Sequence, residues 1–254
     1  SIDVPSGQTS ENVAYVAAQL RALRGFLEQT TGHQIDEGRL VQRVKRGYKT
    51  LQQFDAFQSA RADRFIPSDL VSPLYSGMTN NILLGTEEEA LYTEKLLQDV
   101  KKAPPKKGKH IYWMHTLPFW SDAVKDALLL NDDAQIVGCE LSQATDISRY
   151  SEDPYEEMAM RLIYHALNGP ISRRINAGIR HAKQAGADGV VWFNHWGCKH
   201  TLGGSRIAKK CFEEAGLPTL ILDGDGCDRS HGGEGQTSTR LGAFLEMLGD
   251  FAHE

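Results

Sequence analysis

One stretch decides the fold of this chain: Asp188-Gly-Val-Val-Trp-Phe-Asn-His-Trp-Gly-Cys-Lys-His-Thr-Leu-Gly-Gly-Ser205. The apolar run from Val190 to Phe193 predicts a buried strand, because parallel strands covered on both faces are continuously apolar. Gly197 ends the strand, and a helix is expected to begin near Gly203-Gly204-Ser205. Cys198 would then lie between the carboxyl end of a strand and a helix N-terminus, where open α/β sheets bind their ligands.

Strands and helices alternate after residue 108. Apolar runs predict strands at 110–114, 135–138, 190–193 and 219–222. Helices are expected from Pro118 to about Leu130, through the pattern 163–179, and from Thr239 to about Phe251 with Thr237 or Ser238 as its N-cap. This alternation predicts a Rossmann-like parallel sheet with helices on both faces.

The first hundred residues have a helical pattern instead. Apolar residues at steps of three and four predict a helix over 10–31 with Ser10 as its N-cap, and further helices begin near Asp36, Ser68 and Thr86. We therefore predict a helical region over 1–107 and an α/β lobe over 108–254. Residues 1–6 look like the tail of a strand, so we expect the chain to be the later part of a longer protein.

Composition limits the possible partners. The net charge of −5 does not favour nucleic acid. No apolar run approaches the about eighteen residues of a membrane span, so no membrane partner is expected. Four cysteines without close pairing do not form a disulfide framework, which indicates a cytoplasmic protein.

The strand ends should gather chemistry at one edge of the sheet. That edge would hold His115 and Thr116, Cys139 and Glu140, the segment 194–205 and the loop 223–228. A helix N-terminus would favour the thiolate of Cys198, the form that binds metal. Glycines allow close approach of the backbone to a ligand. The candidate cofactor-binding residues are therefore Gly197, Gly203, Gly204, Ser205 and His195, with Cys198 as the candidate metal ligand.

Simpler interpretations stand beside these. Zinc held by His195, Cys198 and His200 is disfavoured because the paired spacing of structural zinc sites is absent. His110 and His115 are expected to be surface or capping residues. The loop Asp223-Gly-Asp-Gly-Cys-Asp228 could bind a cation or a ribose hydroxyl, or could simply form a tight turn, and no role is fixed for Cys227 or His231.

Several segments together resemble the C-terminal end of the 2-hydroxyacyl-CoA dehydratase / benzoyl-CoA reductase family. They are Trp196-Gly-Cys-Lys199, Gly216-Leu-Pro-Thr-Leu-Ile-Leu-Asp-Gly-Asp225, Glu234-Gly-Gln-Thr-Ser-Thr-Arg240 and Ala243-Phe-Leu-Glu-Met-Leu248. Ile2-Asp-Val-Pro5 and Thr31-Gly-His-Gln-Ile-Asp36 resemble the family's middle region. The resemblance covers essentially the whole chain.

The resemblance implies an iron–sulfur enzyme of anaerobic metabolism. Family subunits have two Rossmann-like lobes joined by a helical region, with a [4Fe-4S] or double-cubane cluster held by three cysteines, of which Cys198 matches the C-terminal one. An ATP-dependent iron–sulfur activator injects one electron into an acyl-CoA thioester, and the resulting ketyl radical loses water, as in a lyase, or is reduced. The implied partners are this activator and a sister subunit or the missing N-terminal lobe.

One departure from the family keeps alternatives open. The two cysteines of the N-terminal lobe have no counterpart here, and neither Cys139 nor Cys211 looks like a replacement. The first hypothesis is an iron–sulfur subunit with Cys198 as ligand. The alternatives are a non-catalytic partner subunit, and a cysteine-nucleophile acyl hydrolase or transferase that uses Cys198 with His195 or a distant histidine as base. Catalytic residues are not assigned.

Overall fold

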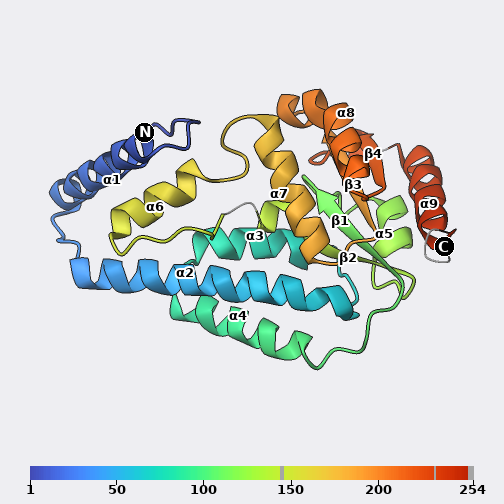
Figure 1. Ribbon diagram of the computed structural model, residues 1–254, viewed down its shortest axis with the longest axis horizontal. Coiled ribbons are helices and arrows are strands. Elements are labelled where there is room, and N and C mark those ends of the chain that lie inside the picture. The colour runs from blue at the N-terminus through green and yellow to red at the C-terminus, as the bar shows by residue number, and fades with distance from the viewer. Residues whose placement is uncertain (144–145, 232, 251–254) are drawn as a thin grey trace.

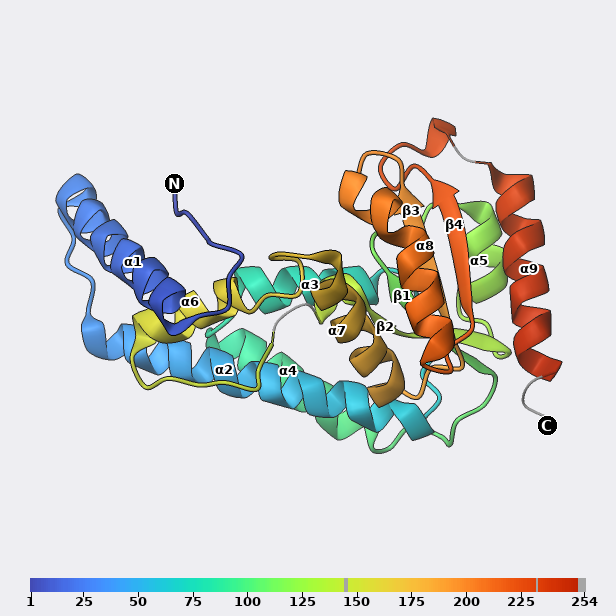
Figure 2. The ribbon, with the colours of Figure 1, turned by 45° about the horizontal axis from the view of Figure 1, so that its top comes forward.

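The computed structural model describes residues 1–143, 146–231 and 233–250, and it has an α/β architecture. Figure 1 shows helices at one end of an elongated molecule and a sheet with its covering helices at the other. At the helical end, α1 (Ser10–Thr31) packs against α6 (Pro154–Ile163), as both views show (Figure 2). Among the described residues, no helix has the length and apolar character needed to cross a membrane.

The helices of the first hundred residues begin and end at the predicted kinds of signal. Thr9, Asp36 and Thr86 cap the N-termini of α1, α2 (Glu37–Ala60) and α4 (Glu87–Val100) through their side-chain oxygens. Thr9 takes the place predicted for Ser10. α3 (Ser72–Ile82) begins four residues later than expected, and α2 packs along α4.

Four parallel strands form the sheet in the order β2-β1-β3-β4. They are β1 (Lys109–Met114), β2 (Ala134–Cys139), β3 (Gly189–His195) and β4 (Thr219–Gly224). In the register of the central strands, Tyr112 lies opposite Val190 and Trp192 opposite Ile221, while the pairing of β1 with β2 shifts after Ile111.

Both faces of this sheet are covered, as predicted. Ile111 and Trp113 face a core formed with α5 (Asp122–Leu128) and α9 (Glu234–Asp250). Tyr112 and Met114 face the opposite core, formed with α7 (Ile171–Gln184) and α8 (Lys199–Glu214). The alternation follows from strand geometry, in which successive side chains point to opposite faces.

The order of the strands creates a topological switch point. The chain leaves β1 toward α5 on one face and leaves the neighbouring β3 toward α8 on the other. The two connections diverge at the carboxyl ends of adjacent strands, and open α/β sheets bind ligands in the crevice at such a point. The structure therefore places the end of β1 and the segment that begins at His195 next to each other at the carboxyl edge of the sheet.

Several predicted boundaries are wrong. α8 begins at Lys199, not near Gly203-Gly204-Ser205, because Cys198 already has the extended backbone of an N-cap. α9 begins at Glu234, so Thr237 and Ser238 lie inside it, and its predicted end at Phe251 lies outside the described residues. The apolar pattern over 163–179 belongs to two helices, α6 and α7, and Pro170 is the N-cap of α7. α5 begins at Asp122 rather than Pro118.

His110 corrects another expectation. It lies in β1 with none of its surface exposed, and its Nε2 accepts a hydrogen bond from the side-chain amide of Gln135 at 3.0 Å. Burial, assisted by the charge of Lys106, lowers the pKa of His110 to about 4. The ring is therefore a neutral part of the core rather than a surface group.

We expect the stability of the chain to fall as the pH falls from 6.5 to about 4. In this window an unfolded histidine binds a proton that native His110 does not, so the free energy of unfolding decreases by on the order of 2 kcal/mol for this residue. The free energy of unfolding, measured with urea at several pH values, should change less steeply with pH in His110→Gln than in the unmodified chain. An equal pH dependence in the two chains would contradict the assignment of His110 as a buried, neutral histidine.

Candidate functional site

The carboxyl ends of the strands bring the predicted rim residues together. The rings of His115 and His195, from the ends of β1 and β3, are stacked with centroids 5.8 Å apart. The Cys139 thiol lies 3.6 Å from the carbonyl oxygen of His115. Asn194 donates from its side-chain amide to Asp223 at 2.8 Å, which ties the ends of β3 and β4.

His115 has an unusual backbone at this rim. Its φ of 75° lies in the left-handed region, which is uncommon for a residue with a side chain. Its N–H donates to Glu140 Oε2 at 2.9 Å, which holds the turn in place. Burial lowers the pKa of His115 to about 4, and nearby positive charge, led by Arg174, acts in the same direction. Strained backbone of this kind concentrates at functional sites.

Cys198 is the N-cap of α8 and is partly exposed. Burial alone would raise the pKa of its thiol, but hydrogen bonds from the Thr201 hydroxyl and from the amides of Thr201 and His200, together with the charge of Arg174, outweigh burial and lower it. The Thr201 hydroxyl donates to Cys198 Sγ at 3.1 Å. These features favour the thiolate, the form that binds a metal or acts as a nucleophile.

A buried ion pair lies behind Cys198. Arg174 of α7 contacts both oxygens of Glu140 at 2.5 and 2.6 Å, and both side chains are almost fully buried. Arg174 Nη1 also donates to the Thr201 hydroxyl at 3.0 Å, and the guanidinium lies 4.8 Å from the Trp192 ring centroid. Glu140 was recognised at the rim from the sequence, whereas no sequence pattern marked Arg174.

The predicted glycines occupy two different environments. A Cβ at Gly197 would lie 2.8 Å from His195 Nε2, so a larger residue here would displace the ring that this turn passes. Gly203, Gly204 and Ser205 lie within α8 rather than at its N-terminus. Gly204 packs closely on Ile171, where a Cβ would come within 2.6 Å of a side-chain carbon. A cofactor-binding role for these residues stays a prediction.

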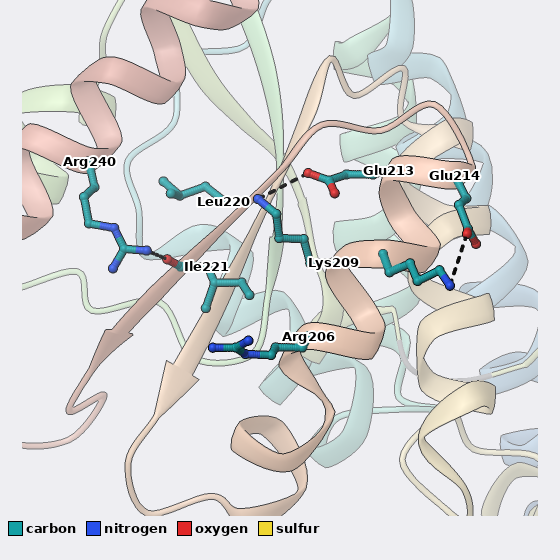
Figure 3. Close-up of a pocket in the computed structure, with 8 residues that line it drawn as sticks. Arg206, Lys209, Glu213, Glu214, Leu220, Ile221 and Arg240 are labelled. Carbon is teal, nitrogen blue, oxygen red and sulfur yellow. Dashed lines mark hydrogen bonds and ion pairs between the residues drawn. The ribbon is translucent and has the colours of Figure 1, made fainter.

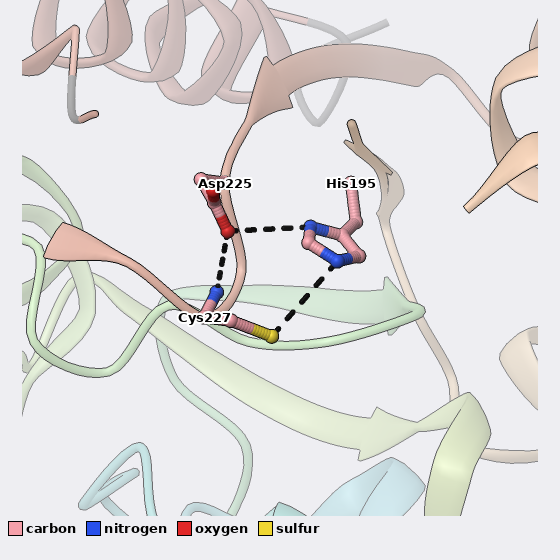
Figure 4. Close-up of side chains that lie close together, drawn as sticks. All are labelled: His195, Asp225 and Cys227. Carbon is pink, nitrogen blue, oxygen red and sulfur yellow. Dashed lines mark hydrogen bonds and ion pairs between the residues drawn. The ribbon is translucent and has the colours of Figure 1, made fainter. Parts of the chain in front are cut away.

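His195 is associated with the loop after β4 (Figure 4). Its Nδ1 accepts a hydrogen bond from the Gly226 amide at 2.9 Å, which leaves the proton of the neutral ring on Nε2. That atom lies 3.9 Å from Cys227 Sγ. Asp225 lies beside them, with Oδ1 3.6 Å from His195 Nδ1 and accepting from the Cys227 amide at 2.8 Å.

The His195, Asp225 and Cys227 group has the residue types of a metal site, with candidate ligand atoms within 4.8 Å of one another. A metal on Nε2 would need the ring proton on Nδ1, where the Gly226 N–H already points. The arrangement therefore favours a hydrogen bond from His195 to Cys227. Within the described residues, the His195 side chain makes no hydrogen bond to Cys198, so the geometry does not favour a Cys198–His195 nucleophile pair.

A groove of ≈ 530 Å³ lies along the outer edge of β4 (Figure 3). Lys209 donates to the carbonyl of Thr219 at 2.8 Å, and Arg240 donates to that of Ile221 at 2.5 Å. Cationic side chains that occupy the carbonyls of an edge strand discourage pairing with a second chain. We interpret this groove as edge protection rather than as part of the site.

The doubly wound sheet, with a thiolate-favouring cysteine at its switch point, defines an α/β protein whose candidate site lies at the carboxyl edge. The family model described as HGD-D, 2-hydroxyglutaryl-CoA dehydratase, D-component, matches residues 1–248, and the chain belongs to this family. A search of curated proteins found no match. The family assignment confirms the resemblance seen in the sequence and identifies a component of a dehydratase-like enzyme.

Loss of Arg174 should destabilise the fold. Arg174→Met leaves the buried Glu140 carboxylate without its ion-pair partner, which typically costs about 3–5 kcal/mol. Denaturant unfolding should show this loss, and Glu140→Gln in the Arg174→Met background should recover much of it. If Arg174→Met alone lowered the free energy of unfolding by less than about 1 kcal/mol, the size typical of exposed ion pairs, the result would contradict the burial of this pair.

The pH dependence of Cys198 alkylation should respond to Thr201. Thr201→Val removes the hydroxyl that donates to the thiolate, so alkylation by iodoacetamide should begin at higher pH than in the unmodified chain. Mass spectrometry of the Cys198 peptide measures the rate at each pH. Thr219→Val is the matched control, because that buried hydroxyl donates to the Leu217 carbonyl instead. An unchanged profile in Thr201→Val would exclude this role.

Proposed function

We propose that this chain is an iron–sulfur subunit of a 2-hydroxyacyl-CoA dehydratase-like enzyme. The observation that carries the proposal is the position of Cys198, a thiol with a lowered pKa at the switch point of a sheet in a chain of this family. The proposed reaction is one-electron elimination of water from an acyl-CoA thioester, or reduction of the acyl group, after ATP-dependent activation.

The donor set of the chain fits one ligand of such a cluster. Iron–sulfur clusters are held by cysteine thiolates, and Cys198 is partly exposed and favours that form. Burial raises the pKa of Cys139 to about 12, which makes this thiol a poor second ligand. Cys211 packs beside the core between α7, α8 and the sheet. We propose that the remaining thiolates come from outside residues 1–254, in a sister subunit or an N-terminal lobe.

A [4Fe-4S] or double-cubane cluster, when bound, would supply single electrons to the thioester so that the hydroxyl can leave through a ketyl radical. The chain's own residues hold and shape the site. Thr201 and the first amides of α8 stabilise the Cys198 thiolate, and the Glu140–Arg174 pair fixes Thr201 from behind. The rings of His115 and His195 stack at the carboxyl ends of β1 and β3, and Gly197 allows the turn to pass close to the His195 ring.

The proposal is tested by iron bound to the assembled protein. The chain is purified without oxygen together with the polypeptides that co-purify with it, and iron content and cluster absorbance are measured. Cys198→Ser should lose the cluster signal with its partners still bound. Cys211→Ser, a matched change in the same helix, should retain it. An iron-free assembly from the unmodified chain, or full cluster content in Cys198→Ser, would refute the proposal.

A further inference from the structure

A cavity of ≈ 270 Å³ lies between β2 and the helices α2, α3 and α4. Phe57, Ile66 and Leu96 form its apolar wall, and Arg61, Ser68 and Ser76 form its polar wall. Cys139, whose thiol contacts the end of β1, also lines this cavity, whereas none of Glu140, Arg174 and Cys198 does, so the cavity lies on the β2 side of the site at the switch point.

Arg61 is a buried cation without a counter-ion in the described part of the chain. The residue is only 8% exposed. Its Nη2 donates to the Ile136 carbonyl at 2.8 Å, and its Nε is buried without a hydrogen-bond partner among the described residues. No ion pair joins it to a carboxylate of the described residues, and its guanidinium lies 5.7 Å from the centroid of the Phe57 ring. Burial lowers the pKa of Arg61 to about 10, against a weaker opposite effect of Asp69, so the guanidinium stays protonated at neutral pH.

Asp69 lines the same cavity, yet its oxygens are directed to the start of α3. They accept from the amides of Val71 and Ser72 at 3.0 and 2.8 Å and from the Ser72 hydroxyl at 2.6 Å. Gln58 also lines the cavity, is 3% exposed, and has a side-chain oxygen without a partner among the described residues. A buried charge without a counter-ion is costly, and a bound anion in the adjacent cavity would compensate the charge of Arg61.

We propose that this cavity binds a small monocarboxylic acid, with its carboxylate on Arg61 and its chain against Phe57, Ile66 and Leu96. The planar fork of arginine matches a carboxylate. One cation beside the acidic Asp69 suits a single negative charge better than a dianion such as phosphate. The volume holds about nine groups of the size of water, enough for an acid of about five carbons.

Isothermal titration calorimetry of the full chain at neutral pH, with valerate as the probe, tests the proposal. Valerate should bind at one saturable site, and its neutral analogue valeramide should bind at least about tenfold more weakly, because a charge-assisted hydrogen bond is lost. Arg61→Met should abolish valerate binding. Arg206→Met, an exposed arginine in the groove along β4, should leave it unchanged.

Leu96→Trp provides a second variant that keeps Arg61 and fills the apolar wall, and it should also block valerate. Circular dichroism checks the fold of each variant, and the comparison of valerate with valeramide in the unmodified chain needs no variant. Equal binding of the acid and the amide would overturn the proposal. So would retained valerate binding in folded Arg61→Met, or inorganic phosphate displacing valerate at similar concentration.

Discussion

A parallel strand that is apolar along its whole length must be covered on both faces, and the rest of the structure depends on this constraint. Ile111 and Trp113 require helices on one face, while Tyr112 and Met114 require them on the other. The connections after β1 and β3 therefore pass to opposite faces. The switch point between them, and the position of Cys198 beside it, follow from covering the core rather than from any requirement of catalysis.

The Glu140–Arg174 pair connects this architecture to the chemistry of the site. Glu140 follows β2 and accepts a hydrogen bond from the N–H of His115 at the end of β1. Arg174, its ion-pair partner, comes from α7 on one face of the sheet. Arg174 in turn reaches Thr201 near the start of α8. One buried interaction thus sets the turn after β1 and the hydrogen bond to the Cys198 thiol, so packing and thiol reactivity are not independent properties here.

Much of the fold and part of the site could be predicted from local patterns. The run Val190–Phe193 identifies a buried strand, and Asp36 and Thr86 mark helix starts, because each signal depends on neighbouring residues. The sequence predicts too late a start for α8 because Gly203-Gly204 is typical of a break, whereas Ile171, which is distant in the sequence, packs against Gly204. Contacts between residues that are distant in the sequence, such as Arg174 with Thr201, leave no local pattern.

The backbone of His115 has a consequence for how the chain tolerates change. A φ of 75° suits glycine far better than histidine, so the sequence keeps a side chain where the backbone of the turn favours none. Replacements that relax the turn would gain stability at the expense of a ring that stacks on His195. A search for more thermostable forms of this protein would thus tend to select such replacements at position 115, and with them the loss of the stacked pair of rings.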